Sequence, residues 1–116
     1  MPLIEVQLST KLSAEDRVVL MTNLSAAVAS KLGKPESYMM VVLRPDATLM
    51  MGGRTDPAAL VKVRSVGTIS PAQARDIAGA VSHSLAKVSG VEEDRVYCVF
   101  QGVPGAMWAQ GGNTFG

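Results

Sequence analysis

The chain has 116 residues, of which 47% are hydrophobic and 18% are charged, so it fits one domain and is too apolar to be disordered. Its formal net charge of +1 excludes a nucleic-acid binder that works by neutralising phosphates. One cysteine, Cys98, and one histidine, His83, exclude a disulfide framework, a CxxC redox pair and a zinc site built from such residues. We expect neither a metal nor another cofactor.

The amino-terminal segment carries no targeting signal that we recognise. Residues 1–11 lack the basic start and the long apolar stretch of a secretory signal peptide. No apolar run in the chain approaches the ~18–20 residues that cross a bilayer. We therefore expect a cytoplasmic protein with no membrane contact, or one that is exported by a route without a signal peptide.

The first half of the chain predicts a strand, a helix and a second strand. Residues 3–8 mostly alternate between apolar and polar, as strands do. Ser13 is a suitable N-cap for a helix, because Glu15 and Asp16 follow it in the first turn. The helix should end at Gly33, before a strand at 38–43 that is apolar on both faces and should lie inside the sheet. The apolar stripe of this helix consists of Leu20, Leu24, Ala27, Val28 and Leu32.

The second half predicts the same order. Residues 60–65 alternate, and Ser70 with Gln73 forms a capping box around a proline at the first helical position. Gly90 ends this helix, and residues 95–100 form the last long strand. The matching apolar stripe consists of Ile77, Ala78, Val81, Leu85 and Val88.

The two halves therefore predict a duplicated β-α-β unit, with repeats at about 1–50 and 58–105 in one domain that spans 1–116. Each crossover makes a parallel strand pair with a right-handed connection. We expect an α/β fold (an α+β two-layer sandwich) in which a four-stranded sheet carries two helices on one face. The strands at 39–43 and 96–100 are too apolar to leave the other face in water, which favours oligomerisation through that face.

Pro2 is a candidate base. Removal of Met1 would leave proline at the terminus as a secondary amine, and an unperturbed α-amino group has a pKa of ~7.7–8.0. An apolar setting beside Leu3 and Ile4 would lower that pKa, because desolvation disfavours the charged form. An amine of this kind can abstract a proton next to a carbonyl near neutral pH. On its own the Met-Pro start is weak, because it occurs in many chains without a catalytic role.

Six short segments agree in order and spacing with one known family. They are Pro2-Leu3-Ile4, Gly33-Lys34-Pro35 followed by Tyr38, Met51-Gly52-Gly53, Ser65-Val66-Gly67, Asp94-Arg95-Val96-Tyr97 and Asn113-Thr114-Phe115. With these segments the chain resembles the macrophage migration inhibitory factor family of tautomerases. The resemblance implies a homotrimer whose three sheets form an inner barrel, with active sites between adjacent subunits.

The resemblance also implies an activity, which is the keto–enol tautomerisation of phenylpyruvate-like carboxylic acids and of dopachrome-type substrates. Pro2 then is the base that moves the proton, and Lys34 binds the substrate carboxylate. Ser65 and Val66 belong to a segment whose backbone N–H contacts that carboxylate. The remaining pocket residues that it implies are Tyr38 as an aromatic wall, Tyr97 from the neighbouring subunit and Phe115 at the mouth.

Three features depart from the family pattern. Val99 stands where the cytokine members carry an asparagine, so the pocket lacks a side-chain donor for a polar substituent on the ring. The CxxC segment of the cytokine is missing, and Trp108 does not keep the family's spacing to the terminal phenylalanine. Two alternatives stay open: a secreted, cytokine-like receptor ligand with a vestigial pocket, and another enzyme of the superfamily such as a decarboxylase.

Overall fold

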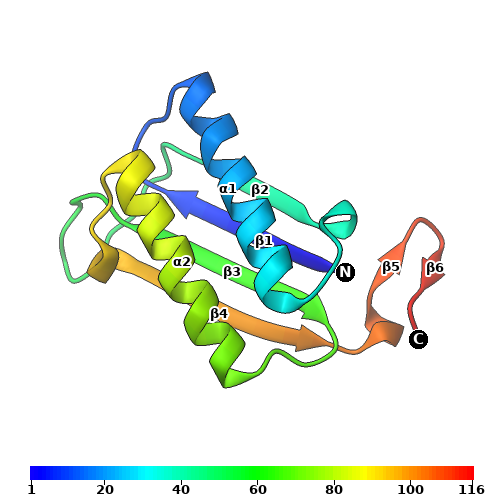
Figure 1. Ribbon diagram of the computed structural model, residues 1–116. Helices are drawn as coiled ribbons and strands as arrows, with labels where there is room; N and C mark the ends of the chain where they lie inside the picture. Colours follow the sequence, from blue (N-terminus) through cyan, green and yellow to red (C-terminus); the bar gives the residue numbers. More distant parts are fainter.

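The computed structural model describes all residues, 1–116. Two helices lie side by side on one face of a four-stranded sheet, and a small hairpin projects from one end of the sheet near the C-terminus (Figure 1). The elements are β1 (Pro2–Leu8), α1 (Ala14–Leu32), β2 (Met40–Arg44), β3 (Ala59–Val66), α2 (Pro71–Ser89), β4 (Val96–Val103), β5 (Ala109–Gln110) and β6 (Asn113–Thr114), with short 3-10 turns at Glu36–Tyr38, Glu93–Arg95 and Gly105–Met107.

The sheet has the strand order β2-β1-β3-β4. β1 runs parallel to β2, β3 runs parallel to β4, and β1 and β3 pair antiparallel in the centre. The predicted duplicated β-α-β fold is therefore confirmed. The expectation that the strand near residue 40 lies inside the sheet is wrong, because the central pairing of β1 with β3 leaves β2 at an edge. Tyr38 belongs to the turn before β2 rather than to the strand.

The helix ends follow the local signals in the sequence. The hydroxyl of Ser13 accepts a hydrogen bond from the backbone N–H of Asp16 at 3.1 Å. Ser70 and Gln73 form a reciprocal capping box, with bonds of 3.1 and 2.9 Å. Gly33 ends α1 in the left-handed region at φ 66°, where a residue with a Cβ would be strained. Neither helix is long and apolar enough to span a membrane.

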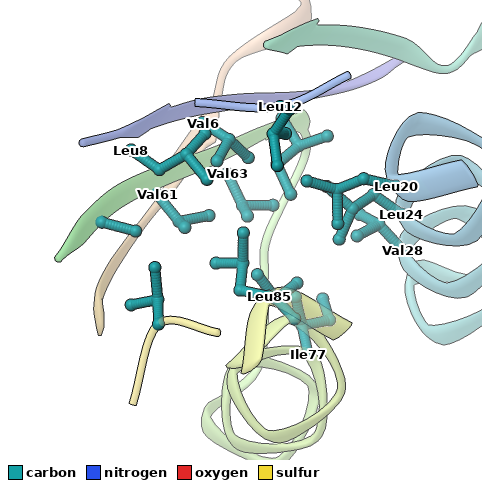
Figure 2. Close-up of a cluster of buried hydrophobic side chains, with 14 of the residues drawn as sticks. Val6, Leu8, Leu12, Leu20, Leu24, Val28, Val61, Val63, Ile77 and Leu85 are labelled. Carbon is teal, nitrogen blue, oxygen red and sulfur yellow. The ribbon is translucent and has the colours of Figure 1, made fainter. Parts of the chain in front are cut away.

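The core lies between the helices and the sheet (Figure 2). Alternate residues of β1 and β3 point toward the helices and are fully buried, among them Val6 and Val63. They meet the predicted helical stripes, and each fully buried Leu or Val contributes about 1.5–3 kcal/mol to folding. The helical side chains of this cluster are Leu20, Leu24, Val28, Leu32, Ile77, Val81 and Leu85.

The opposite face of the sheet is not covered by any element of this chain. Its outer strands are apolar there, as predicted, with Met40 on β2 and Val99 on β4 exposed by 60% and 54%. Its central strands are not, because they carry Glu5, Lys62 and Arg64. The Arg64 guanidinium donates to the Glu5 carboxylate at 2.8 Å. The expectation that the uncovered face of the sheet is apolar is therefore correct for the two edge strands and wrong for the two central strands.

Candidate active site

A pocket of about 430 Å³ opens at the end of the sheet where β1 and β2 both begin. Parallel strands start at the same edge, so the beginning of β1, the turn before β2 and the start of β2 come together there. The C-terminal hairpin lies at the same end of the sheet (Figure 1), and residues 108–110 line one side of the pocket. The lining residues are Met1, Pro2, Leu3, Ser37, Tyr38, Met39, Met40, Trp108, Ala109 and Gln110.

Pro2 is buried at this edge as the first residue of β1. Its partner on β3 is Ser65, whose exposure is 1%. One residue further, the backbone N–H of Val66 donates to the carbonyl oxygen of Met1 at 3.0 Å. The chain start is thus held in the sheet, and the predicted residues Pro2, Ser65 and Val66 lie together.

The electrostatic setting favours a neutral amine at the chain start. The pKa of the Met1 amino group is lowered from its ordinary value of 8.0, first by burial and second by the positive charge of Lys34. Lys34 follows the cap residue of α1, and its backbone N–H donates to the carbonyl oxygen of Ala29 at 3.0 Å. The structure therefore brings the Lys34 charge near the terminus, although Lys34 does not itself line the pocket.

The C-terminal hairpin contributes a wall that the sequence did not reveal. The N–H of Phe115 donates to the carbonyl oxygens of Gly105 and Trp108, at 3.0 and 3.1 Å. A Cβ on Gly105 would collide with the backbone of Phe115, so glycine is required for this close return. Trp108, which has no role by sequence spacing, lines the pocket. Phe115 does not line it and is 41% exposed.

Tyr97 and Val99 lie away from the Pro2 pocket of their own chain. Tyr97 pairs with Leu60 on β3, whereas Pro2 pairs with Ser65. These two β3 positions are five residues apart, about 16 Å in an extended strand. Tyr97 is on the open face and is 63% exposed. A site that uses both Pro2 and Tyr97 needs two copies of the chain.

Comparison with known proteins shows which family this chain belongs to. All of residues 1–116 match the family model described as macrophage migration inhibitory factor (MIF). The chain belongs to the MIF family. Among its relatives, the MIF homologue of Trichinella spiralis is 35% identical over 95 residues, which are 82% of this chain and 83% of that protein.

Solved MIF structures have the same fold. The MIF of Toxoplasma gondii superposes with a TM-score of 0.94 at 31% identity, over 97% of this chain and 99% of that one. The homologue from Prochlorococcus marinus superposes with a TM-score of 0.92 at 32% identity, over 98% and 99% of the two chains. The resemblance drawn from six sequence segments is thereby confirmed.

Proposed function

We propose that this MIF-family chain is an isomerase that interconverts the keto and enol forms of phenylpyruvate-like 2-oxo acids, with the amine of Pro2 as the base. Dopachrome-type compounds are a further substrate class. The observation that carries the proposal is the position of Pro2, which is buried in the sheet edge beside an apolar pocket and near the charge of Lys34.

The amine must first be released from its peptide bond to Met1. While Met1 is attached, the nitrogen of Pro2 is an amide whose lone pair is delocalised into the carbonyl, so it cannot act as a base. After removal of Met1, Pro2 carries the free amine one residue deeper in the fold. Burial and Lys34, which lower the pKa of the Met1 amine, act on the Pro2 amine as well. A lowered pKa of the Pro2 amine raises its neutral fraction near pH 7.

The proton transfer needs only this one group. The neutral Pro2 nitrogen takes a proton from C3 of the keto acid, and the electron pair of the C–H bond moves into a C2–C3 double bond as the C2 oxygen becomes an enolate. The prolinium then gives its proton to that oxygen. The enol leaves, and the nitrogen is neutral again, so the cycle requires no cofactor.

Two donors support carboxylate binding. Lys34 supplies a positive charge near the amine. The N–H of Val66 is occupied by the Met1 carbonyl at 3.0 Å, so removal of Met1 would free it for a substrate oxygen. A charge-assisted hydrogen bond of this kind contributes about 1.5–3 kcal/mol. Tyr38 and Trp108 offer flat apolar surfaces for a ring.

A homotrimer would complete the site, since Tyr97 and Pro2 cannot meet within one chain. The apolar edges of the open face, Met40 on β2 and Tyr97 with Val99 on β4, are surfaces that a second copy would bury. Light scattering should give three times the chain mass of 12.2 kDa. A stable monomer at micromolar concentration would contradict the trimer and leave the site incomplete.

Exchange of the C3 protons of phenylpyruvate with deuterated solvent tests the reaction directly. The chain without Met1 should accelerate this exchange well above the uncatalysed rate, and a Pro2→Gly variant should lose most of the acceleration. Equal exchange with both proteins would remove Pro2 from the mechanism. A screen with 3-oxo acids distinguishes the isomerase from a decarboxylase, because only a decarboxylase releases carbon dioxide.

A further inference from the structure

The proposed chemistry leaves one buried charge without a role. Arg95 is 7% exposed at the end of the 3-10 turn that precedes β4, and no carboxylate lies within salt-bridge distance of it. Its Nε donates to the carbonyl oxygen of Pro57 at 3.0 Å, and its terminal nitrogens donate to the carbonyl oxygens of Met51, Arg54 and Asp56 at 3.1–3.3 Å. All of these acceptors belong to the loop between β2 and β3.

This loop contains a tight turn at residues 51–54. Met51 and Arg54 exchange two backbone hydrogen bonds, of 3.0 and 3.1 Å, around two glycines with φ of 62° and 73°. Positive φ at both central positions is the turn geometry that glycine supplies. The four carbonyls that the loop directs at Arg95 have partial negative charge, and they replace the water that a guanidinium would otherwise need.

The loop that Arg95 binds lies next to Tyr97. Leu49, Met50 and Met51 line an apolar crevice of about 180 Å³ together with Leu60 and Tyr97. Tyr97 is the second residue of β4, two residues after Arg95, which ends the 3-10 turn before that strand. Tyr97 is 63% exposed, and the side of it that is covered lies against this crevice.

We infer that Arg95 is a positioning residue for substrate binding: its guanidinium holds residues 51–57 behind Tyr97 and so sets the apolar wall that one subunit presents to the active site of the next. The inference rests on the proposed function, in which Tyr97 contacts a ring bound at the Pro2 of a neighbouring copy. Arg95 touches neither the substrate nor the amine, and it acts through Tyr97.

Lysine is the substitution that isolates this role. Arg95→Lys keeps the charge, but one ammonium has three donors at a single point and cannot serve four carbonyls arranged around a planar fork. Tyr97 contacts the ring rather than the reacting carbon, so its misplacement weakens ground-state and transition-state binding alike. We expect a rise in KM of about tenfold for phenylpyruvate, with kcat within twofold and an unchanged pH profile.

The matched control is Arg54→Gln. Arg54 lies in the same loop, and its ion pair with Asp56 is 3.3 Å long and largely exposed, so its loss should leave KM unchanged. If Arg95→Lys fails to fold, Leu49→Ala opens the crevice while the hydrogen bonds of Arg95 stay intact, and it should raise KM in the same direction.

Hybrid trimers test whether Arg95 acts on the active site of the neighbouring subunit. Chains that carry Arg95→Lys are refolded together with chains that carry Pro2→Gly, so that some sites combine the intact Pro2 of the first with the intact Tyr97 wall of the second. These sites should have the KM of the unmodified protein. A hybrid that keeps the raised KM would overturn the inference, because the defect would then stay within the Arg95→Lys subunit.

The outcomes separate the two proposals. An unmodified protein and an Arg54→Gln variant that both fail to turn over phenylpyruvate would overturn the proposed function, and this inference with it. An active protein whose KM is unaffected by Arg95→Lys and by Leu49→Ala would overturn only the role of Arg95.

Discussion

Replacement of Lys34 by alanine should change two properties of the site, which are the binding of the substrate carboxylate and the pKa of the Pro2 amine. The size of the first change and the direction of the second can be predicted. Loss of a charge-assisted hydrogen bond to the substrate carboxylate costs about 1.5–3 kcal/mol, which is about 10- to 150-fold in KM. The methyl ester of the same acid carries no charge, so its KM should change little.

The second property is the pH dependence of kcat/KM. The Pro2 amine is the proposed base, so activity should rise with pH as this amine loses its proton. The surroundings that lower the pKa of the Met1 amine should place the midpoint below the ~7.7–8.0 of a free α-amino group. Lys34 is the second of two causes of that lowering. Lys34→Ala should therefore move the midpoint upward, and the midpoint should stay below 8.0 because burial, the larger cause, remains.

Steady-state kinetics with the acid and its ester, across a pH series, measures both effects. Lys31→Ala is the matched control, since Lys31 is an exposed lysine in the last turn of α1. If the acid and the ester suffer equally, Lys34 does not bind the carboxylate. If the midpoint falls, the electrostatic argument for the amine is refuted.

Three further predictions address the pocket, the thiol and the core. Val99→Asn should raise activity toward phenolic acids more than toward unsubstituted aromatic acids, and equal effects would show that position 99 does not face the ring. Burial raises the pKa of the Cys98 thiol to about 11, even though a hydrogen bond from Ser82 opposes the shift, so iodoacetamide at pH 8 should react slowly with the folded protein and quickly after unfolding in urea. Leu85→Ala removes a fully buried side chain and should lower the free energy of unfolding in urea by about 2–5 kcal/mol, whereas Val18→Ala on the exposed side of α1 should change it by less than about 0.5 kcal/mol.

The parts of the fold that local chemistry decides were predictable from the sequence. Ser13 and the Ser70–Gln73 pair act within one helical turn, and Gly33 acts through its own φ angle. The position of β2 was not predictable in this way. An apolar strand can be covered either by neighbouring strands of its own sheet or by another copy, and the residue pattern is the same in both cases.

The site was predictable only where a residue's role follows from its own chemistry or from the family resemblance. Pro2 could be proposed as the base because a terminal secondary amine can take a proton and because the family resemblance points to the same residue. Trp108 was missed, because its place in the pocket depends on the return of the hairpin, which the contact between Gly105 and Phe115 decides. The burial of Arg95 and its contacts with the loop were missed as well. Its partners are backbone carbonyls, and their positions cannot be read from the pattern of side chains in the sequence.

The central claim is that the free amine of Pro2 is the base, and one measurement tests it most directly. Preparations with and without Met1, distinguished by intact mass, are compared in the phenylpyruvate enol–keto assay at equal protein concentration. The account predicts that the form without Met1 is active and that the form with Met1 is nearly inactive, because its Pro2 nitrogen is an amide and its Met1 carbonyl occupies the N–H of Val66. A preparation that retains Met1 throughout and turns over as fast as the trimmed one would contradict it.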